Sequence, residues 1–504
     1  MSNGNAIIGI DIGTTSTKSV LFDREGKPLG SLAVEYPLLQ EQPGWAEQEP
    51  EEIVQAVVRS VRGAIESAGL RGEDVAGVGI SSAMHALIAV GGDGRALTRS
   101  ITWADGRSEP QARAIRERMG GREIYLRTGT PVHPMSPLPK LLWLKENRPD
   151  VWTDASKFVS IKEYLVYRLF GEWVVDHAIA SATGLFRLDT LDWDEEALRL
   201  LGLPRERLSE LKPATYRLEG LNAELADAMG LRRDTPFFLG SSDGGLANLG
   251  VGAIGPGDMA VTIGTSAAVR MMTREPITDE RQRTFCYSVN ESSYVIGGAT
   301  NNGAIVLQWI RNSLFGGGQT TEELLEEASR AAPGAEGLLF LAFLSGERAP
   351  IYNADARGTF VGANLGHRRE HFVRAGLEGV LYGVLSVAEA LKDLAGPAAE
   401  VRASGGFARS PLWLQMLADM LGREVAVPRV TEASALGAAM MAMQGLGMLE
   451  NLGRAKEWAP VDRRLQPDPV RHGVYRELFG IYEKLRDQLP ERFAELAAFQ
   501  RKVR

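Results

Sequence analysis

Cysteine is nearly absent, since the chain of 504 residues contains only Cys286. A single cysteine cannot form a disulfide within the chain, and chains without disulfides are typical of reducing compartments. The first residues do not resemble a signal peptide, because no Lys or Arg precedes their apolar run and Asp11 interrupts that run. We therefore expect a cytoplasmic protein.

Long apolar runs and an excess of positive charge are also missing. The longest weakly polar stretches, residues 337–346 and 437–443, are far shorter than the ~20 apolar residues of a membrane span. Lys plus Arg total 56 against 64 Asp plus Glu, and the net charge of -8 disfavours a nucleic-acid or membrane surface. The six histidines and one cysteine show no zinc spacing. Small molecules are the expected partners.

Glycine is abundant, with 56 residues, and its clusters follow predicted strands. β-Branched runs at residues 6–12, 17–22 and 29–36 predict an antiparallel meander. Residues 51–67 have the apolar spacing of a helix, and residues 75–80 return to strand character. The predicted order is βββαβ.

A similar phrase follows roughly 250 residues later. A strand-like run at residues 258–263 ends in a Gly-Thr-Ser corner, and a second run follows at residues 267–272. The length suits two or more domains. The repeat predicts an α/β protein with two related lobes that face each other, residues 1–248 and 249–504, and hinge glycines near residues 240–257.

The second half alternates predicted helices and strands. Residues 372–395 carry a helical apolar stripe, and residues 401–403 form a strand-like run. Ser410 and Pro411 predict the start of a helix, with a cap and a proline at its first position. Residues 474–496 predict one packed, charged amphipathic helix.

The two glycine corners could bind phosphate, because such corners present backbone N–H groups and hydroxyls to an anion. Asp11 ends the strand before the first corner and would suit Mg²⁺ held through water, although it could simply cap a turn. A Walker P-loop is excluded, because its motif is absent and a strand follows the corner. A third glycine pair, between a strand and a helix, could approach a nucleotide or form a plain tight turn. The candidate residues are Gly13, Thr14, Thr15, Gly264, Thr265, Ser266, Gly405 and Gly406.

Asp243 is the candidate general base. It lies among small residues in the predicted junction, and phosphoryl transfer to a hydroxyl needs a carboxylate within reach of the attacking O–H. The alternative is an Asp that only forms a turn.

A polar cluster after two predicted strands of the first half suits a polyhydroxylated substrate. Taken separately, His85 suits a satisfied strand-end histidine and Trp103 a core aromatic residue. Together they favour a pocket, because sugar sites combine carboxylates and donors with an aromatic wall. The cluster comprises His85, Trp103, Asp105 and Arg107. His133, between two prolines, could reach a cleft or form a surface turn, and Lys140 could contact an anion or extend along the surface to solvent.

The sequence resembles the FGGY carbohydrate kinases, of the actin, hexokinase and heat-shock ATPase superfamily, over about residues 6–455. Residues 135–147 fit the first family signature throughout. Residues 358–378 fit the second more loosely, because Ala363 and Gly376 stand where other residues are usual.

This resemblance implies two ribonuclease-H-like lobes around a central cleft that binds Mg-ATP and a sugar. The N-terminal lobe would hold the sugar and the first phosphate motif, and the C-terminal lobe the nucleotide. Asp243 matches the family's base. The implied nucleotide-binding set adds Lys18 to the first corner and Gly303, near the adenine, to the second half. A homodimer is the oligomer that the family suggests.

Within the family, residues 81–85, 101–108 and 127–137 are most similar to gluconate kinases, which implies conversion of D-gluconate to 6-phospho-D-gluconate. The substrate carboxylate would then be met by Arg107, Lys140 or the two histidines. A xylulose kinase is the first alternative. An actin-like or chaperone-like ATPase is the alternative from another class.

Overall fold

The computed structural model describes residues 5–503, which divide into two units, each built on a β-sheet. The first unit contains the chain up to Ile254, together with Met272–Val295 and Glu432–Ala459. The second contains Gly255–Met271, Ile296–Thr431 and the chain from Pro460. Both units are therefore assembled from separate stretches of sequence. The division into functional lobes at residues 248 and 249 remains a prediction.

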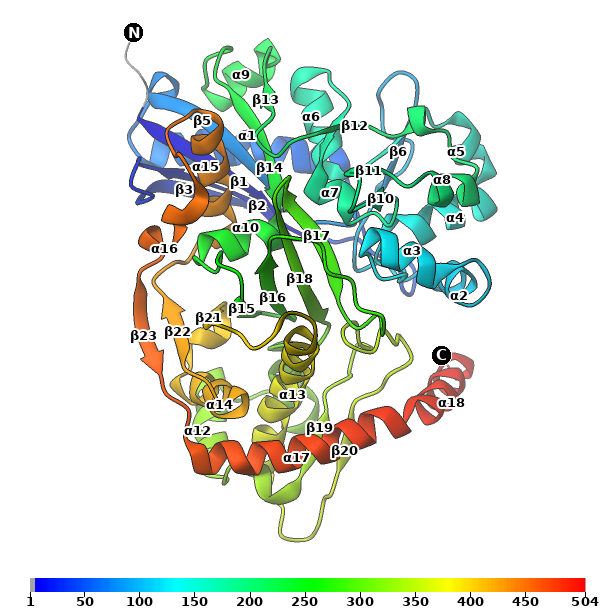
Figure 1. Ribbon diagram of the computed structural model, residues 1–504, viewed down its shortest axis with the longest axis vertical. Coiled ribbons are helices and arrows are strands. Elements are labelled where there is room, and N and C mark those ends of the chain that lie inside the picture. Colours follow the sequence, from blue (N-terminus) through cyan, green and yellow to red (C-terminus); the bar gives the residue numbers. More distant parts are fainter. Residues whose placement is uncertain (1–4, 504) are drawn as a thin grey trace. The chain divides into compact units, whose positions relative to one another are not determined.

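The sheet of the first unit has the strand order β13-β14-β5-β1-β2-β3 (Figure 1). β1 is antiparallel to β2 and parallel to β5, and β5 is parallel to β14. The predicted βββαβ order is confirmed, with helix α1 between β3 and β5. The bounds are β1 Ala6–Ile12, β2 Ser16–Phe22, β3 Pro28–Glu35, α1 Pro50–Ser67, β5 Val75–Ser82, β13 Arg217–Leu218 and β14 Phe237–Ser242.

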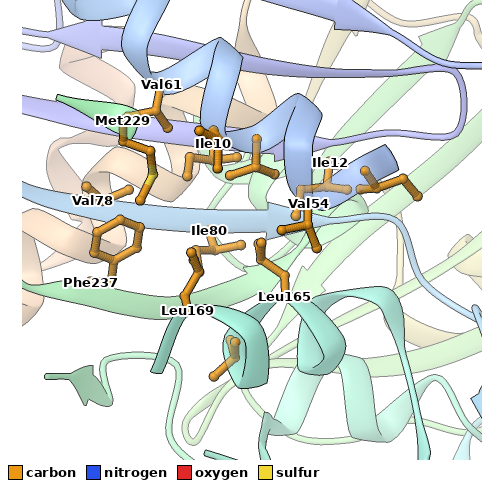
Figure 2. Packing of buried hydrophobic residues seen from close by; sticks show 14 of the residues in the cluster. Ile10, Ile12, Val54, Val61, Val78, Ile80, Leu165, Leu169, Met229 and Phe237 are labelled. Carbon is orange, nitrogen blue, oxygen red and sulfur yellow. The ribbon is translucent and has the colours of Figure 1, made fainter. Parts of the chain in front are cut away.

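Alternation along β1 explains how its two faces are covered. Ile8, Ile10 and Ile12 join the core formed with α1 and with α6, Ile161–Phe170. Figure 2 shows Ile10 and Ile12 in this packing. On the opposite face, a Cβ at Gly9 would collide with the backbone of Ala435 in helix α15, Ala433–Gly445. The absence of a side chain thus lets α15 pack directly on the sheet.

The remaining elements of the first unit follow the strand ends or surround the sheet. They are β4 Glu47–Gln48, β6 Ile88–Val90, β7 Ser100–Ile101, α2 Glu109–Arg118, α3 Gly121–Thr128, α4 Pro137–Asn147, α5 Pro149–Asp154, β8 Lys157–Val159, β9 Val174–Asp176, α7 His177–Ser181, β10 Phe186–Arg187, β11 Asp192–Trp193, α8 Glu195–Leu201, β12 Glu210–Lys212, α9 Ala223–Met229, α10 Asp243–Gly250, β17 Phe285–Asn290 and α16 Ala455–Trp458. Much of the glycine-rich segment predicted as a hinge forms the end of β14 and helix α10.

The second unit repeats this topology. Its sheet runs β18-β16-β15-β21-β22-β23, with β15 antiparallel to β16 and parallel to β21, as β1 is to β2 and β5. β21 is parallel to β22, as β5 is to β14. The predicted duplication of an α/β fold is confirmed. The bounds are β15 Asp258–Ile263, β16 Ala267–Thr273, β18 Ser293–Thr300, α11 Ile305–Trp309, α12 Thr321–Ser329, β19 Leu339–Leu341, β20 Thr359–Val361, α13 Arg369–Ala395, β21 Glu400–Ser404, α14 Pro411–Leu421, β22 Val425–Pro428 and β23 Val461–Leu465.

The C-terminal segment differs from the single helix predicted for residues 474–496. Two helices are present, α17 Pro469–Gln488 and α18 Pro490–Lys502. Pro490 cannot donate the backbone hydrogen bond that would continue α17, which explains the break. Among residues 5–503, no helix combines the length and apolar character needed to cross a bilayer.

Candidate active site

The parallel strands β1, β5 and β14 bring three segments together at their carboxyl ends. Asp11 of β1 is in register with Ser81 of β5, and Ser81 with Ser241 of β14. The Ser81 hydroxyl donates to Asp11 Oδ1 at 3.0 Å. Asp243 follows directly as the first residue of α10. The predicted metal-binding residue and the predicted base therefore lie at one edge of one sheet.

The electrostatic environment of Asp11 shows how close these carboxylates are. Burial, and next the charge of Asp243, raise the pKa of Asp11 to about 7. Glu432 raises it further, while the Ser81 hydrogen bond and Lys18 oppose the shift. Two mutually destabilised carboxylates favour a cation between or beside them, so this donor set fits a magnesium ion.

Lys18 forms an ion pair with Glu432, the residue before α15. Lys18 stands opposite Asp11 in the β1–β2 pairing, so its ammonium belongs to the same corner. Glu432 was missed by the sequence analysis because 414 residues separate the partners and no local signal links them. Ser434 of α15 also donates to the Asp243 carbonyl at 3.4 Å. The start of α15 is therefore part of the site.

The first glycine corner is held by a network of side chains. The Gly13 amide donates to the Ser16 carbonyl at 2.9 Å, which closes the turn, and Thr15 is exposed. Trp103 Nε1 donates to Thr14 Oγ1 at 2.8 Å. This bond joins the predicted sugar-binding cluster to the predicted phosphate corner.

His85 has a left-handed backbone with φ of 70°. Its Nδ1 lies 2.7 Å from the Ala182 carbonyl, and because a carbonyl only accepts, Nδ1 must carry the proton. The imidazole also contacts the ring of Tyr287 edge to face, at 5.7 Å between centroids. The backbone thus fixes both the tautomer and the orientation of His85.

Asp105 and Arg107 are bonded chiefly to the protein itself. Asp105 is 1% exposed and accepts from the Ala46 amide at 2.7 Å and from Arg107 Nε at 2.8 Å. Arg107 also donates to Glu47 at 2.6 Å and lies 3.5 Å from the ring centroid of Trp45. Both residues therefore support the segment that carries Trp103, and direct contact with a substrate remains a prediction.

Lys140 serves neither of the roles predicted for it. Its side chain is fully buried, and Nζ donates to the carbonyls of His85 and Thr102 at 2.7 Å and of Met135 at 2.8 Å. A fourth bond reaches the Ile101 carbonyl at 3.2 Å. Burial lowers the pKa of Lys140 to about 7. This ammonium joins the segments that carry His85, Trp103 and His133. We call these segments, which are predicted to bind the sugar, the acceptor side.

In the second unit, Gly303 packs against the second glycine corner. The Gly264 amide donates to the Ser266 carbonyl at 2.9 Å, and the Gly303 amide to the Thr265 carbonyl at 3.0 Å. A Cβ at Gly303 would lie 2.6 Å from the Gly264 carbonyl oxygen. Gly405 has φ of 96°, and a Cβ there would meet the Ile263 carbonyl at 2.5 Å. Glycine is therefore required where these strand ends converge.

A cavity of about 590 Å³ begins beside Gly406, where a Cβ would meet no other atom. Its volume is that of a typical small-molecule site. Its apolar and aromatic walls, with a few polar groups, fit a nucleoside. The lining residues from α11 and α12 were not predicted from the sequence. The lining includes Ala304, Leu307, Gln308, Arg311, Thr321, Glu322, Leu325, Phe407 and Trp413.

A duplicated α/β fold with glycine corners and carboxylates at its strand ends defines a phosphotransferase of the sugar-kinase type. Residues 6–250 match the N-terminal domain of the FGGY family of carbohydrate kinases, and residues 259–446 match its C-terminal domain. The chain belongs to this family of enzymes, which phosphorylate alcohol groups and for which ATP is the implied phosphate donor. The resemblance stated from the motifs is confirmed.

Several relatives are similar over nearly the whole chain. The gluconokinase of Bacillus subtilis (strain 168) is 42% identical, covering 98% of each chain. A xylulose kinase of Staphylococcus epidermidis is 29% identical, covering 97% of this chain and 98% of its own. The solved gluconate kinase of Lactobacillus acidophilus has a TM-score of 0.94 and 36% identity, over 97% of this chain and 99% of its own. A ligand-bound xylulose kinase structure from the same organism gives the same values.

Asp11→Asn should change how stability depends on pH. The pKa of Asp11 is about 7 in the folded protein against an ordinary value of 3.8, so between these values the folded protein holds a proton that the unfolded chain releases. The free energy of unfolding of the wild type therefore falls as pH rises through this window. We expect the melting temperature of the variant, relative to that of the wild type, to rise as pH increases from about 4 to about 7, because only the wild type loses this stability. Calorimetry without nucleotide or metal measures this. A difference in melting temperature that does not change with pH would contradict the prediction.

Lys140→Met should impair acceptor binding more than nucleotide binding. Buried carbonyls of three segments lose their donor, at a cost of about 1–3 kcal/mol for each unsatisfied group. We expect the KM for the sugar to rise about 10-fold, with the KM for ATP within about 2-fold, because the acceptor side loses its geometry. Steady-state kinetics measures both constants. Lys145→Met is the control, since Lys145 lies on the same helix but donates to the Leu201 carbonyl at 2.6 Å and lies 5.8 Å from the ring centroid of Trp152. Equal changes in both KM values would show that Lys140 has no specific effect on the acceptor side.

Proposed function

We propose that this chain transfers the γ-phosphoryl group of ATP to a hydroxyl of D-gluconate and forms 6-phospho-D-gluconate. The observation that carries the proposal is the 42% identity to a gluconokinase over 98% of both chains. The xylulose kinases of Staphylococcus epidermidis, Bacillus subtilis and Lactococcus lactis are 27–30% identical. The acidic pair at the strand ends supplies the chemistry that such a transfer needs.

Asp243 acts as the general base in this proposal. Its Oδ1 accepts from the Gly244 amide at 2.6 Å, which orients the carboxylate at the start of α10. The carboxylate takes the proton of the attacking hydroxyl as the new P–O bond forms, and the bond between the γ-phosphorus and the bridging oxygen breaks, so that ADP leaves. Asp11 would hold Mg²⁺ through water, and the ion would offset the negative charge of the phosphates.

The glycine corners bind the nucleotide. In the first unit, Thr14 and Thr15 offer hydroxyls and backbone N–H groups to phosphate. Lys18 offers its ammonium, which would leave its ion pair with Glu432 to bind the phosphate. In the second unit, Gly264, Thr265 and Ser266 form the second phosphate corner. Gly406 lines the 590 Å³ cavity, to which we assign the adenosine, and Gly303 and Gly405 directly precede its lining residues Ala304 and Gly406.

The acceptor side is formed by His85, Trp103, Asp105 and Arg107. Gluconate is an anion and needs a donor for its carboxylate. Lys140 already serves four carbonyls, and Arg107 serves Asp105 and Glu47. We therefore assign the carboxylate contact to His133, because the neutral His85 ring has its proton on Nδ1, bonded to the Ala182 carbonyl, and its Nε2 can only accept a hydrogen bond from a sugar hydroxyl. His133 Nδ1 accepts from the Met135 amide at 3.1 Å, so in the neutral ring the proton is on Nε2, and that nitrogen is a donor.

Three further proposals follow from the family resemblance. The enzyme works with Mg²⁺, it acts in the cytoplasm, and it forms a homodimer. Light scattering coupled to size-exclusion chromatography measures the last of these directly.

Xylulose is the second candidate acceptor. The observation that favours it is the Lactobacillus acidophilus structure described as a ligand-bound xylulose kinase, which matches this chain as well as the gluconate kinase does. The motif around His85 is compatible with either sugar.

A coupled assay of ADP release should distinguish the acceptors. With ATP and a panel of gluconate, xylulose, ribulose, glycerol and erythritol, we expect kcat/KM for gluconate to exceed that for every other compound by at least about 100-fold. A site built for a carboxylate rejects analogues without one, because its buried donor is then left unpaired. A preference for xylulose would show that the proposed substrate is wrong and would leave the assignment as a sugar kinase unchanged. ATP turnover that no sugar stimulates would contradict the kinase assignment itself.

Asp243→Asn should lower kcat by about 100-fold or more, the scale of lost general-base catalysis. Because the amide has the same shape, we expect the KM for both substrates and the melting temperature to change little. Kinetics and calorimetry on the same preparation measure all four quantities. An unchanged kcat would remove Asp243 from the role of base.

A further inference from the structure

A β-bulge precedes the proposed base. The register between β14 and β5 shifts between Phe238 and Ser241, and Gly240 has φ of 66°. A Cβ at Gly240 would collide with the Ile80 carbonyl, so only glycine fits there. Bulges bend a strand and redirect the residues that follow. The direction of residues 241–243 thus depends on how the chain is held after the bulge.

Lys162 of α6 holds the chain at this point. Its Nζ donates to the Ser241 carbonyl at 3.0 Å and to Asp176 Oδ2 at 2.7 Å. The side chains of Lys162 and Asp176 are 1% and 0% exposed. A carbonyl next to a bulge has a disrupted ladder, and burial requires that it find a donor. Burial lowers the pKa of Lys162, and the charges of Asp176, Glu163 and, least, Asp243 oppose that shift.

Asp176 extends the same contact to the acceptor side. It ends β9, and its Oδ1 accepts from the Ile179 amide at 3.0 Å, which caps α7. Directly after α7, the Ala182 carbonyl accepts a hydrogen bond from His85 Nδ1. One buried ion pair therefore supports both the strand of the base and the helix that orients the histidine.

We propose that the Lys162–Asp176 ion pair positions the catalytic groups: Lys162 fixes Asp243 through the Ser241 carbonyl, and Asp176 fixes His85 through α7. The inference rests on the proposed function, in which Asp243 is the base. Stability alone does not account for the pair, because a buried ion pair can often be replaced by apolar residues without loss of stability. The two residues are positioning residues, since neither is assigned a contact with substrate.

Three variants test this: Lys162→Met, Asp176→Asn and the double variant. Each single variant leaves a buried charge unpaired, so we expect a lower melting temperature. The double variant has no buried charge, and Asn can still cap α7, so we expect it to regain most of the wild-type melting temperature. We expect its kcat to stay about 10-fold or more below that of the wild type, because Met cannot donate to Ser241 and a small misplacement is costly. Recovery of kcat together with the melting temperature would overturn the proposal.

The buried pair Arg374–Glu378 in the second unit is the matched control, with side chains 6% and 2% exposed. Arg374→Met, Glu378→Gln and their combination should lower the melting temperature without changing kcat per folded enzyme. An equal loss of kcat in this set would also overturn the positioning role. Failure of the proposed function is seen separately, since Asp243→Asn tests the base. If another sugar is the acceptor, the same comparison is made with that sugar.

Discussion

The mutual repulsion of two carboxylates, Asp11 and Asp243, is the constraint around which the first unit is arranged. Parallel β1, β5 and β14 must end at the same edge of the sheet, and this topology brings the two acids together. Such a pair is costly in the absence of positive charge. The surrounding groups offset that cost. Ser81 donates to Asp11, the charge of Lys18 attracts Asp11, and the charge of Lys162 attracts Asp243. The same imbalance makes the edge attractive to a metal ion and to the proton of a hydroxyl.

Close approach of backbone to backbone is the second feature that both units share. In the first, Gly9 and Gly79 leave no side chain between the sheet and α15, so that helix begins beside Asp11 and Asp243. In the second, Gly303 and Gly405 leave none between the segments that meet at the second corner. Glycine costs conformational entropy in a strand, and here it allows contacts that any side chain would prevent. The high glycine content therefore reflects dense packing at the strand ends as well as turns.

Local patterns predict most of the elements that build the site. Residues 258–263 match β15 at both ends, and both glycine corners lie where strand ends were expected. Asp243 was expected in a glycine-rich junction, and it begins helix α10 directly after β14. The sequence could not predict contacts between residues far apart in the chain. Examples are the ion pair between Lys18 and Glu432 and the hydrogen bond from Lys162 to the Ser241 carbonyl. No local periodicity encodes such pairs, because only the folded topology brings them together. The break at Pro490 was predictable in principle, since the charged helical pattern continues through a residue that cannot continue a helix.

The acceptor side shows that a cation in a motif need not bind the ligand. Lys140 lies within the family signature, yet its ammonium donates to four carbonyls of its own chain. Arg107 is likewise occupied by Asp105 and Glu47. These charges fix the loops that carry His85 and Trp103, and they would do so for any sugar. In the function that we propose, the choice between gluconate and xylulose is therefore left to the few side chains that this framework presents to the sugar.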